Sequence, residues 1–164
     1  MSLYLRYGGC ALLMIGALLI SRCYDGYLSR RVEEYRGLVS LLSHAECEIS
    51  KFLAYGSALW RDFQHDGLER CGFLPALRES GSLYQALEAA GDRMSLSSSA
   101  REGLSAQFQR LGRGYVDKEL SLIGEIKQGL SAELESESAE AEKNKRVARA
   151  LLLGGALSLV VMVI

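Results

Sequence analysis

The sequence has little proline, few aromatic residues and no excess of charge of either sign. A single proline occurs in 164 residues, aromatic residues make up 8%, and the formal net charge at pH 7 is −1. Because there is also no sustained alternation of polar and apolar residues, nothing indicates β-strands. A near-neutral chain has no basic footprint, so we expect no nucleic acid among its partners. The composition therefore favours helices.

Motifs of catalysis and cofactor binding are also lacking. The serines occur without a nucleophile elbow, and no glycine-rich segment carries the lysine of a phosphate-binding loop. Asp62 and His65, beside Asp66, could begin a metal site, but no second pair has ligand spacing. We expect free thiols at the four cysteines, which form no close pair: Cys10, Cys23, Cys47 and Cys71. We therefore predict an interaction protein without cofactor or metal. An unrecognised enzyme site at Asp62, His65 and Asp66 is the competing hypothesis.

An apolar segment is present at each end of the chain. Residues 3–20 and 147–164 each hold one charged residue, Arg6 and Arg149. Eighteen residues are close to the lower limit for a helix that spans a bilayer. The alternative for the first segment is a cleaved signal peptide, although no small-residue cleavage site follows Ile20. The alternative for the second is a buried core helix.

The two apolar segments divide the chain into three expected parts. These are a transmembrane helix over 1–22, a helical domain over 23–146 and a transmembrane helix over 147–164. Basic residues flank both segments on the side of the central domain: Arg22, Arg30, Arg31, Arg36, Lys143, Lys145 and Arg146. The positive-inside rule then predicts a two-pass protein of the cell membrane with a cytoplasmic middle and both termini outside.

Two long amphipathic helices are expected in the central domain. The first runs on from the apolar segment to near Tyr55-Gly56, and its apolar face carries Leu28, Val32, Tyr35, Val39, Leu42, Ala45, Ile49 and Phe52. The second follows a break at Gly112-Arg113-Gly114, and its face carries Val116, Leu120, Ile123, Ile126, Leu130, Leu134 and Ala141. Both lead into the terminal segments.

Shorter elements are expected between the long helices. A short helix should carry Leu59, Trp60 and Phe63, followed by a loop with Gly67, Gly72 and Pro75. A further helix should begin after an N-cap at Ser82 and stop at Gly91. Ser99 and Glu102 resemble a capping box for a helix that carries Leu104, Phe108 and Leu111. The expected fold is all-α, an antiparallel bundle of about six helices between two terminal transmembrane helices.

Several short motifs resemble the stage III sporulation protein AB family. The first long helix contains Leu41-Leu42 and Glu46-Cys47-Glu48-Ile49, similar to a leucine-rich stretch of that family. The carboxy-terminal third is more distinctive, with Phe108-Gln109-Arg110-Leu111-Gly112, Glu125-Ile126-Lys127, Ala141-Glu142-Lys143-Asn144 and Leu153-Gly154. Two segments depart from the family pattern: Gly56-Ser57-Ala58-Leu59 replaces Thr-Pro-Leu, and Arg113-Gly114-Tyr115-Val116-Asp117 replaces Gly-x-Ser-Asp.

The resemblance implies a function. Members look like single cytoplasmic domains of the type II secretion platform protein F, and the segment from Gly81 to Leu87 is similar to a signature of those domains. The chain would be a non-enzymatic platform subunit, in the mother-cell membrane around the forespore, of the channel apparatus between the two cells. Its partners would be a cytoplasmic secretion-type ATPase, other membrane subunits of the complex and the lipid bilayer, and it could form a homo-oligomer. The alternative is a membrane-anchored helical adaptor or sensor unrelated to sporulation.

An ATPase that docks on such a platform should meet the end of the bundle furthest from the membrane. The long helices should reach that end near Ala54–Gly56 and Gly114–Glu119. Exposed arginines suit such contacts because a guanidinium group binds carboxylates with two hydrogen bonds. Glu79 and Arg101 should share this end, and we predict that the partner-binding residues are Arg61, Arg78, Arg110 and Arg113.

Overall fold

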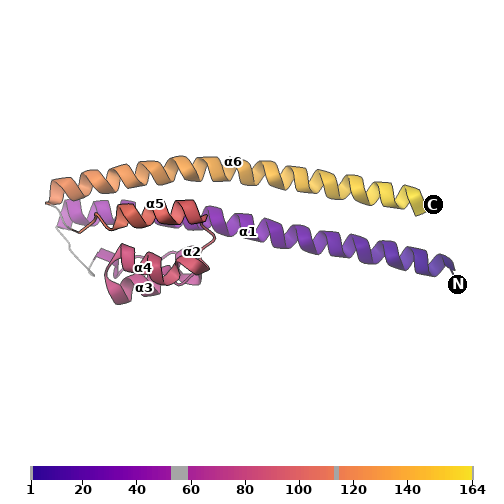
Figure 1. The fold of residues 1–164 in the computed structure, drawn as a ribbon, viewed down its shortest axis with the longest axis horizontal. Coiled ribbons are helices and arrows are strands. Elements are labelled where there is room, and N and C mark those ends of the chain that lie inside the picture. Colours follow the sequence, from indigo (N-terminus) through magenta and orange to yellow (C-terminus); the bar gives the residue numbers. More distant parts are fainter. Residues whose placement is uncertain (1, 53–58, 113–114, 164) are drawn as a thin grey trace. The chain divides into compact units, whose positions relative to one another are not determined.

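The structure is a computed structural model, and all regular structure in its described part is helical. It describes the backbone of residues 2–52, 59–112 and 115–163, with the side chains of 15, 16, 18–51, 59–112, 115–148, 150, 151, 154, 155 and 158. In chain order the helices are α1 (Ser2–Phe52), α2 (Asp66–Arg70), α3 (Phe73–Ser80), α4 (Leu83–Ala90), the 3-10 helix η2 (Gly91–Arg93), α5 (Ser98–Phe108) and α6 (Val116–Val163) (Figure 1). The expected all-α fold of about six helices is confirmed.

The chain divides into two compact units. Arg30–Glu137 forms one, called here the bundle unit, and Met1–Ser29 with Ser138–Ile164 forms the other, the terminal unit. Helices α1 and α6 contribute to both. The first long helix does run on from the apolar segment, as expected, because α1 begins at Ser2 and ends at Phe52.

In the terminal unit, α1 and α6 contact each other through polar side chains near Ser29. Lys145 Nζ donates a hydrogen bond to Ser29 Oγ at 3.1 Å. Leu28 and Ala141 are buried. Within the residues whose side chains the structure describes, no helix has a stretch long and apolar enough to cross a membrane. Most side chains of the expected membrane segments, 3–20 and 147–164, lie outside those residues.

In the bundle unit, α1 and α6 are antiparallel. Arg31 forms an ion pair with Glu137, and Glu46, further along α1, forms one with Lys127, which comes earlier in α6. The order of the partners is therefore reversed between the two helices, as the bundle prediction requires.

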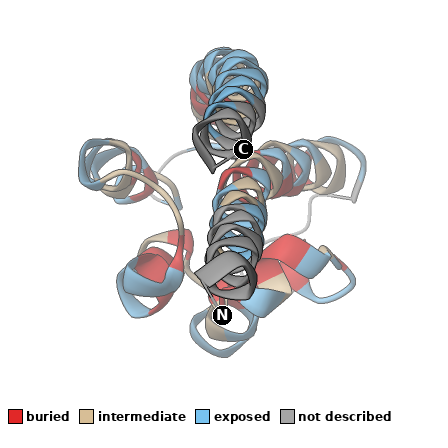
Figure 2. Cartoon of the chain, turned by 90° about the vertical axis from the view of Figure 1, so that its right-hand side faces the viewer, coloured by how far each residue is buried: buried red, intermediate tan, exposed pale blue. Residues whose placement is uncertain are grey.

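The core of the bundle unit draws on all six α-helices that the structure describes, and Figure 2 shows the buried residues in red. Tyr35, Leu42, Ala45 and Ile49 are buried on α1, as the periodicity predicts, and Val39 is partly buried against the core. Leu38 and Leu41 are fully buried as well and widen the stripe. On α6 the expected positions Ile123, Ile126 and Leu130 are buried, with Val116, Leu120 and Leu134 packed against the core.

The loop expected around Gly67, Gly72 and Pro75 is wrong, because two helices occupy this region. Gly67 lies within α2 and is buried. Gly72 is the N-cap of α3 at φ 83° and Gly81 its C-cap at φ 67°, backbone conformations that glycine adopts without strain. Pro75 is the third residue of α3, where the backbone has no intrahelical acceptor for an N–H group. Gly72 and Gly81 therefore cap α3, and Pro75 lies in its first turn.

Two other short elements differ from the expectation. Leu59 and Trp60 form a 3-10 turn in place of a short helix, although they are buried with Phe63. The N-cap of α5 is Ser97, whose Oγ accepts a hydrogen bond from Ala100 N at 3.2 Å, and Ser99 already lies inside the helix. An extended backbone at Ser97 places its hydroxyl over the first turn, so the earlier serine caps the helix.

The remaining expectations about these elements have mixed outcomes. Helix α4 has its N-cap at Ser82 and its C-cap at Gly91, as expected. Leu104 and Phe108 are buried on α5, whereas Leu111 follows the helix and is only partly buried. The expected end at Tyr55-Gly56 and the break at Arg113-Gly114 lie outside the described residues.

Candidate functional site

Two of the four arginines predicted to bind a partner are exposed without an internal ion pair. Within the described residues, Arg61 and Arg110 take part in no side-chain hydrogen bond or ion pair. Arg78 is engaged inside the bundle unit, because its Nη1 lies 2.6 Å from Glu69 Oε1 and its Nη2 donates to Phe63 O at 2.9 Å. Arg113 lies outside the described residues. Among the described arginines of this set, Arg61 and Arg110 are therefore the two without an internal ion pair, and the structure does not test Arg113.

The sequence neighbours of these two arginines line a mainly apolar cavity of about 340 Å³. Trp60 and Leu111, their immediate neighbours, line it together with Ile49, Leu83, Phe108 and Ile123. Gly112 N donates a hydrogen bond to Glu119 Oε2 at 3.0 Å, which holds the start of α6 against the end of α5. The indole Nε1 of Trp60 is buried and has no hydrogen-bond partner within the described residues.

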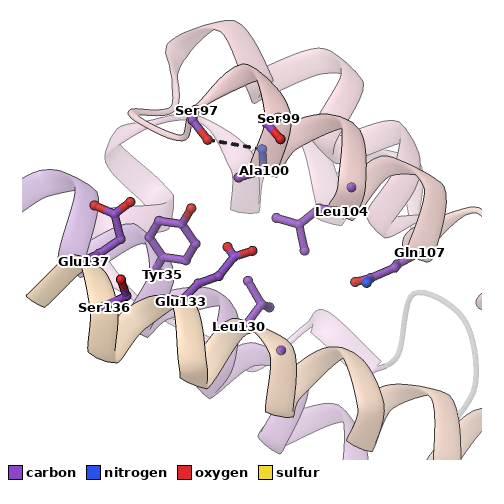
Figure 3. A pocket seen from close by; sticks show the side chains of 12 residues that line it. Tyr35, Ser97, Ser99, Ala100, Leu104, Gln107, Leu130, Glu133, Ser136 and Glu137 are labelled. Atoms are coloured by element: carbon purple, nitrogen blue, oxygen red, sulfur yellow. Dashed lines mark hydrogen bonds between the residues drawn. The ribbon is translucent and has the colours of Figure 1, made fainter.

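A more polar groove of about 300 Å³ lies between α5 and α6, with α1 beneath it (Figure 3). Tyr35 from α1, Leu104 from α5 and Leu130 from α6 form its apolar wall. The carboxylate of Glu133 points into the groove from α6, toward Tyr35. Further oxygen-bearing side chains line it: Ser97, Ser99, Gln107, Ser136 and Glu137.

The electrostatics of the groove are dominated by its two glutamates. The pKa of Tyr35 is raised to about 12: burial is the largest cause, and the charge of Glu133, its hydrogen bond with the tyrosine and the charge of Glu137 act in the same direction. Arg31 opposes these effects and forms the ion pair with Glu137. Tyr35 therefore stays a neutral hydrogen-bond donor under a negatively charged groove.

The two glycines that line the groove leave open space beside their helices. A Cβ atom placed on Gly103 of α5 or Gly129 of α6 would meet no atom within 4 Å. Among the described side chains that line the groove there is no histidine or cysteine. The groove offers hydrogen-bond acceptors and negative charge, which suit recognition of a cationic or hydroxyl-bearing group.

The competing enzyme hypothesis concerned Asp62, His65 and Asp66. His65 packs against α1, where a Cβ on Gly37 would lie 2.8 Å from His65 Nδ1. Its Nδ1 is buried and unpartnered in the described structure. In the part of the chain that the structure describes, no three His, Cys, Asp or Glu side chains are placed to hold a metal ion. His65, the N-cap of α2, thus lies at a close contact with α1.

Sequence reasoning missed the residues that shape these sites. Glu133 is one of several glutamates in a charged stretch of α6, and its direction follows from the position of α5, which the sequence does not show. Glu34, a buried carboxylate, precedes the buried Tyr35, and nothing in the sequence distinguishes it from the half-buried Glu33. Gly37 within the buried stripe of α1 was the available signal for a close helix contact.

Comparison with known proteins gives no relative: no family model, no curated protein and no solved structure matches this chain.

Proposed function

We propose that this chain is a non-enzymatic platform subunit that is anchored in a membrane by its two ends and docks a partner on its helical bundle. The observation that carries the proposal is the location of exposed apolar residues. Of nine large apolar residues exposed within the described part, eight belong to the terminal unit: Ile15, Leu18, Leu19, Ile20, Tyr24, Tyr27, Val147 and Leu151. Exposed apolar residues gathered on one part of a protein mark a surface that water does not normally cover.

The terminal segments suit insertion in a bilayer. Each holds one charged residue in eighteen, and arginine and lysine flank both on the side of the bundle unit. The cell membrane is therefore the proposed location, with the central domain in the cytoplasm. The free thiols of the bundle unit, Cys47 and Cys71, are compatible with a reducing cytoplasm.

The proposed partner is a cytoplasmic secretion-type ATPase, with the other membrane subunits of the stage III sporulation complex beside it. The resemblance of the short motifs to the stage III sporulation protein AB family supports this identification. The exposed Arg61 and Arg110 supply charge, and their sequence neighbours Trp60 and Leu111 line an apolar cavity, so this region offers the charge and apolar area that a docked protein surface requires. We expect them to contact carboxylates of the ATPase.

A charge reversal tests the docking surface. Arg61→Glu with Arg110→Glu should weaken co-purification of the ATPase with the full-length chain from membranes. Arg36→Glu with Arg93→Glu changes the charge equally at exposed arginines elsewhere in the bundle unit and should leave the ATPase bound. Equal recovery of the ATPase with both double variants would show that these arginines are not the docking surface.

The sporulation role has its own test. A strain that lacks this protein should stop before it forms heat-resistant spores, and the wild-type chain should restore them. Normal spore formation in the deletion strain would favour the other reading, a membrane-anchored adaptor or sensor unrelated to sporulation.

A further inference from the structure

A third cavity in the bundle unit gathers positive charge from distant parts of the sequence. Its volume is about 220 Å³. Arg30 of α1, Arg70 of α2 and Arg93 of η2 line it. Three guanidinium groups repel one another unless acids or an anion lie between them.

One of the three arginines is neutralised within the cavity wall. Arg70 Nη2 lies 2.9 Å from Glu33 Oε2, and Arg70 Nε donates to Asp66 O at 3.1 Å. This arginine is thus held by two neighbours, and its charge is balanced by Glu33.

Glu34 is the other acid of the cavity lining, and its charge interacts with that of Arg30. Its Oε2 accepts a hydrogen bond from Ser95 N at 2.6 Å, and the side chain of Ser95 bonds to it as well. Burial raises the pKa of Glu34, an effect that these hydrogen bonds and the charge of Arg30 only partly offset. Within the described residues, neither Arg30 nor Arg93 forms an ion pair. The cavity therefore keeps an excess of positive charge beside a carboxylate whose ionisation is disfavoured.

We propose that this cavity binds a phosphate-bearing anion between the guanidinium groups of Arg30 and Arg93. The planar donors of arginine match phosphate oxygens in pairs, and the cavity is large enough for one phosphate group. Such an anion would supply the negative charge that Glu34 alone does not. The inference goes beyond the proposed platform function and does not depend on the ATPase.

The same chemistry has two possible sources, a free phosphate or the headgroup of an anionic lipid. Arg30 belongs to the basic residues that follow the first apolar segment, which makes a headgroup accessible if that segment enters a membrane. Both ligands would present phosphate oxygens to the arginines, and the experiment below distinguishes a free phosphate from a lipid headgroup.

The test uses the full-length chain in an uncharged detergent, with inorganic phosphate as the first probe and native mass spectrometry as the readout. Arg30→Gln with Arg93→Gln should weaken phosphate binding by about tenfold or more, because two charge-assisted contacts are lost. Arg36→Gln with Lys51→Gln removes the same charge from exposed basic residues that do not line the cavity and should bind as the wild type does. An equal loss in both variants, or no binding by the wild type to phosphate or to lipid, would overturn the proposal.

A second readout does not depend on mass spectrometry. Cys71 is a buried free thiol that lines the cavity, whereas Cys23 is exposed in the terminal unit. Saturating phosphate should slow alkylation of Cys71 by iodoacetamide and leave Cys23 unchanged. The protection should disappear in the Arg30→Gln, Arg93→Gln variant. Protection that persists in that variant would contradict the site.

The lipid arm replaces phosphate by mixed micelles that contain either phosphatidylglycerol or phosphatidylcholine. A headgroup ligand predicts selective retention of phosphatidylglycerol, which is lost in the cavity variant and kept in the control variant. Phosphate binding with no lipid selectivity would support the site with a free phosphate as its ligand. Lipid retention that is the same in both double variants, without phosphate binding, would contradict the proposal.

Discussion

At the scale of single residues, the bundle unit contains two buried groups whose ionisation is disfavoured. Glu34 is 4% exposed and Tyr35 is 1% exposed, and burial is the largest cause of the raised pKa of each. They differ in their partners. Ser95 donates hydrogen bonds to Glu34 and partly offsets its burial, whereas Tyr35 faces negative charge that adds to the effect. Adjacent positions on one helix thus have different electrostatic surroundings.

The first prediction concerns Glu34 and pH. Because its folded-state pKa is raised above the usual 4.5, Glu34 favours folding most below that pH and loses this contribution as pH rises through the folded pKa. Glu34→Gln keeps an acceptor for Ser95 N without the charge, so it should melt at or above the wild-type temperature at pH 8. The difference should shrink as the pH falls toward 4.5.

Glu34→Ala is the matched variant, because it removes the acceptor as well. The unsatisfied Ser95 N–H should then cost about 1–3 kcal/mol at all pH values. Thermal unfolding of the full-length chain, followed by the fluorescence of Trp60, measures both variants. A Gln variant that is less stable than wild type at pH 8 and gains stability with acid would contradict the assignment.

The second prediction concerns Tyr35. Spectrophotometric titration of the eight tyrosines should show one that ionises near pH 12, and Tyr35→Phe should remove this component. Glu133→Gln should shift it downward, since Glu133 contributes charge and a hydrogen bond to the rise. An unchanged titration curve in the Tyr35→Phe variant would show that another tyrosine is responsible.

At the scale of helices, Gly37 of α1 makes a close contact with His65 and Leu68, at the start of and within α2. A Cβ on Gly37 would lie 2.8 Å from both His65 Nδ1 and Leu68 Cγ, which is closer than packed atoms allow. Glycine at this point of a long helix lowers helix propensity but permits the approach of a second helix. Gly124 of α6 is a helical glycine with nothing within 4 Å of its added Cβ.

The third prediction uses this pair of glycines. Gly37→Ala should destabilise the bundle unit by about 1–3 kcal/mol through overpacking. Gly124→Ala should stabilise it by about 1 kcal/mol, because alanine favours the helix and meets no neighbour. Chemical denaturation measures both. Truncation of the opposing ring in a Gly37→Ala, His65→Ala double variant should recover part of the loss, and stabilisation by Gly37→Ala alone would show that the contact is not tight.

Helical periodicity predicted the long elements well because each repeats one signal over many turns. Leu42 and Ile49 on α1, and Ile126 and Leu130 on α6, are buried where the spacing places them. The region from Gly67 to Pro75 was wrongly predicted because glycine and proline have two roles, and only the observed φ of Gly72 distinguishes a cap from a loop. The groove and the arginine cavity could not be predicted, since they depend on which helices meet. Arg30 and Arg93 are 63 positions apart and become neighbours only in the fold.

At the scale of the whole molecule, the two units differ in where their apolar residues lie. In the bundle unit they are mostly buried, with Tyr115 the one large apolar side chain exposed among its described residues. In the terminal unit several are exposed, among them Ile20 at 72% and Leu151 at 71%. Burying a leucine or isoleucine of this kind in an apolar phase contributes about 1.5–3 kcal/mol, so even a few make exposure to water unfavourable. This contrast is the reason for proposing an anchored protein.

The last prediction concerns membrane topology. Ser80 is exposed at the end of α3 in the bundle unit, so a cysteine there can react with reagents in solution without disturbing the core. In a background where the four native cysteines are replaced, a Ser80→Cys thiol should react with an impermeant maleimide only after the cells are permeabilised. A cysteine placed before the first apolar segment, at Ser2, should react in intact cells, because both termini are expected outside. Labelling of the thiol at position 80 in intact cells, with no labelling at position 2, would reverse the proposed orientation. Recovery of the chain in the soluble fraction would show that it is not anchored in a membrane.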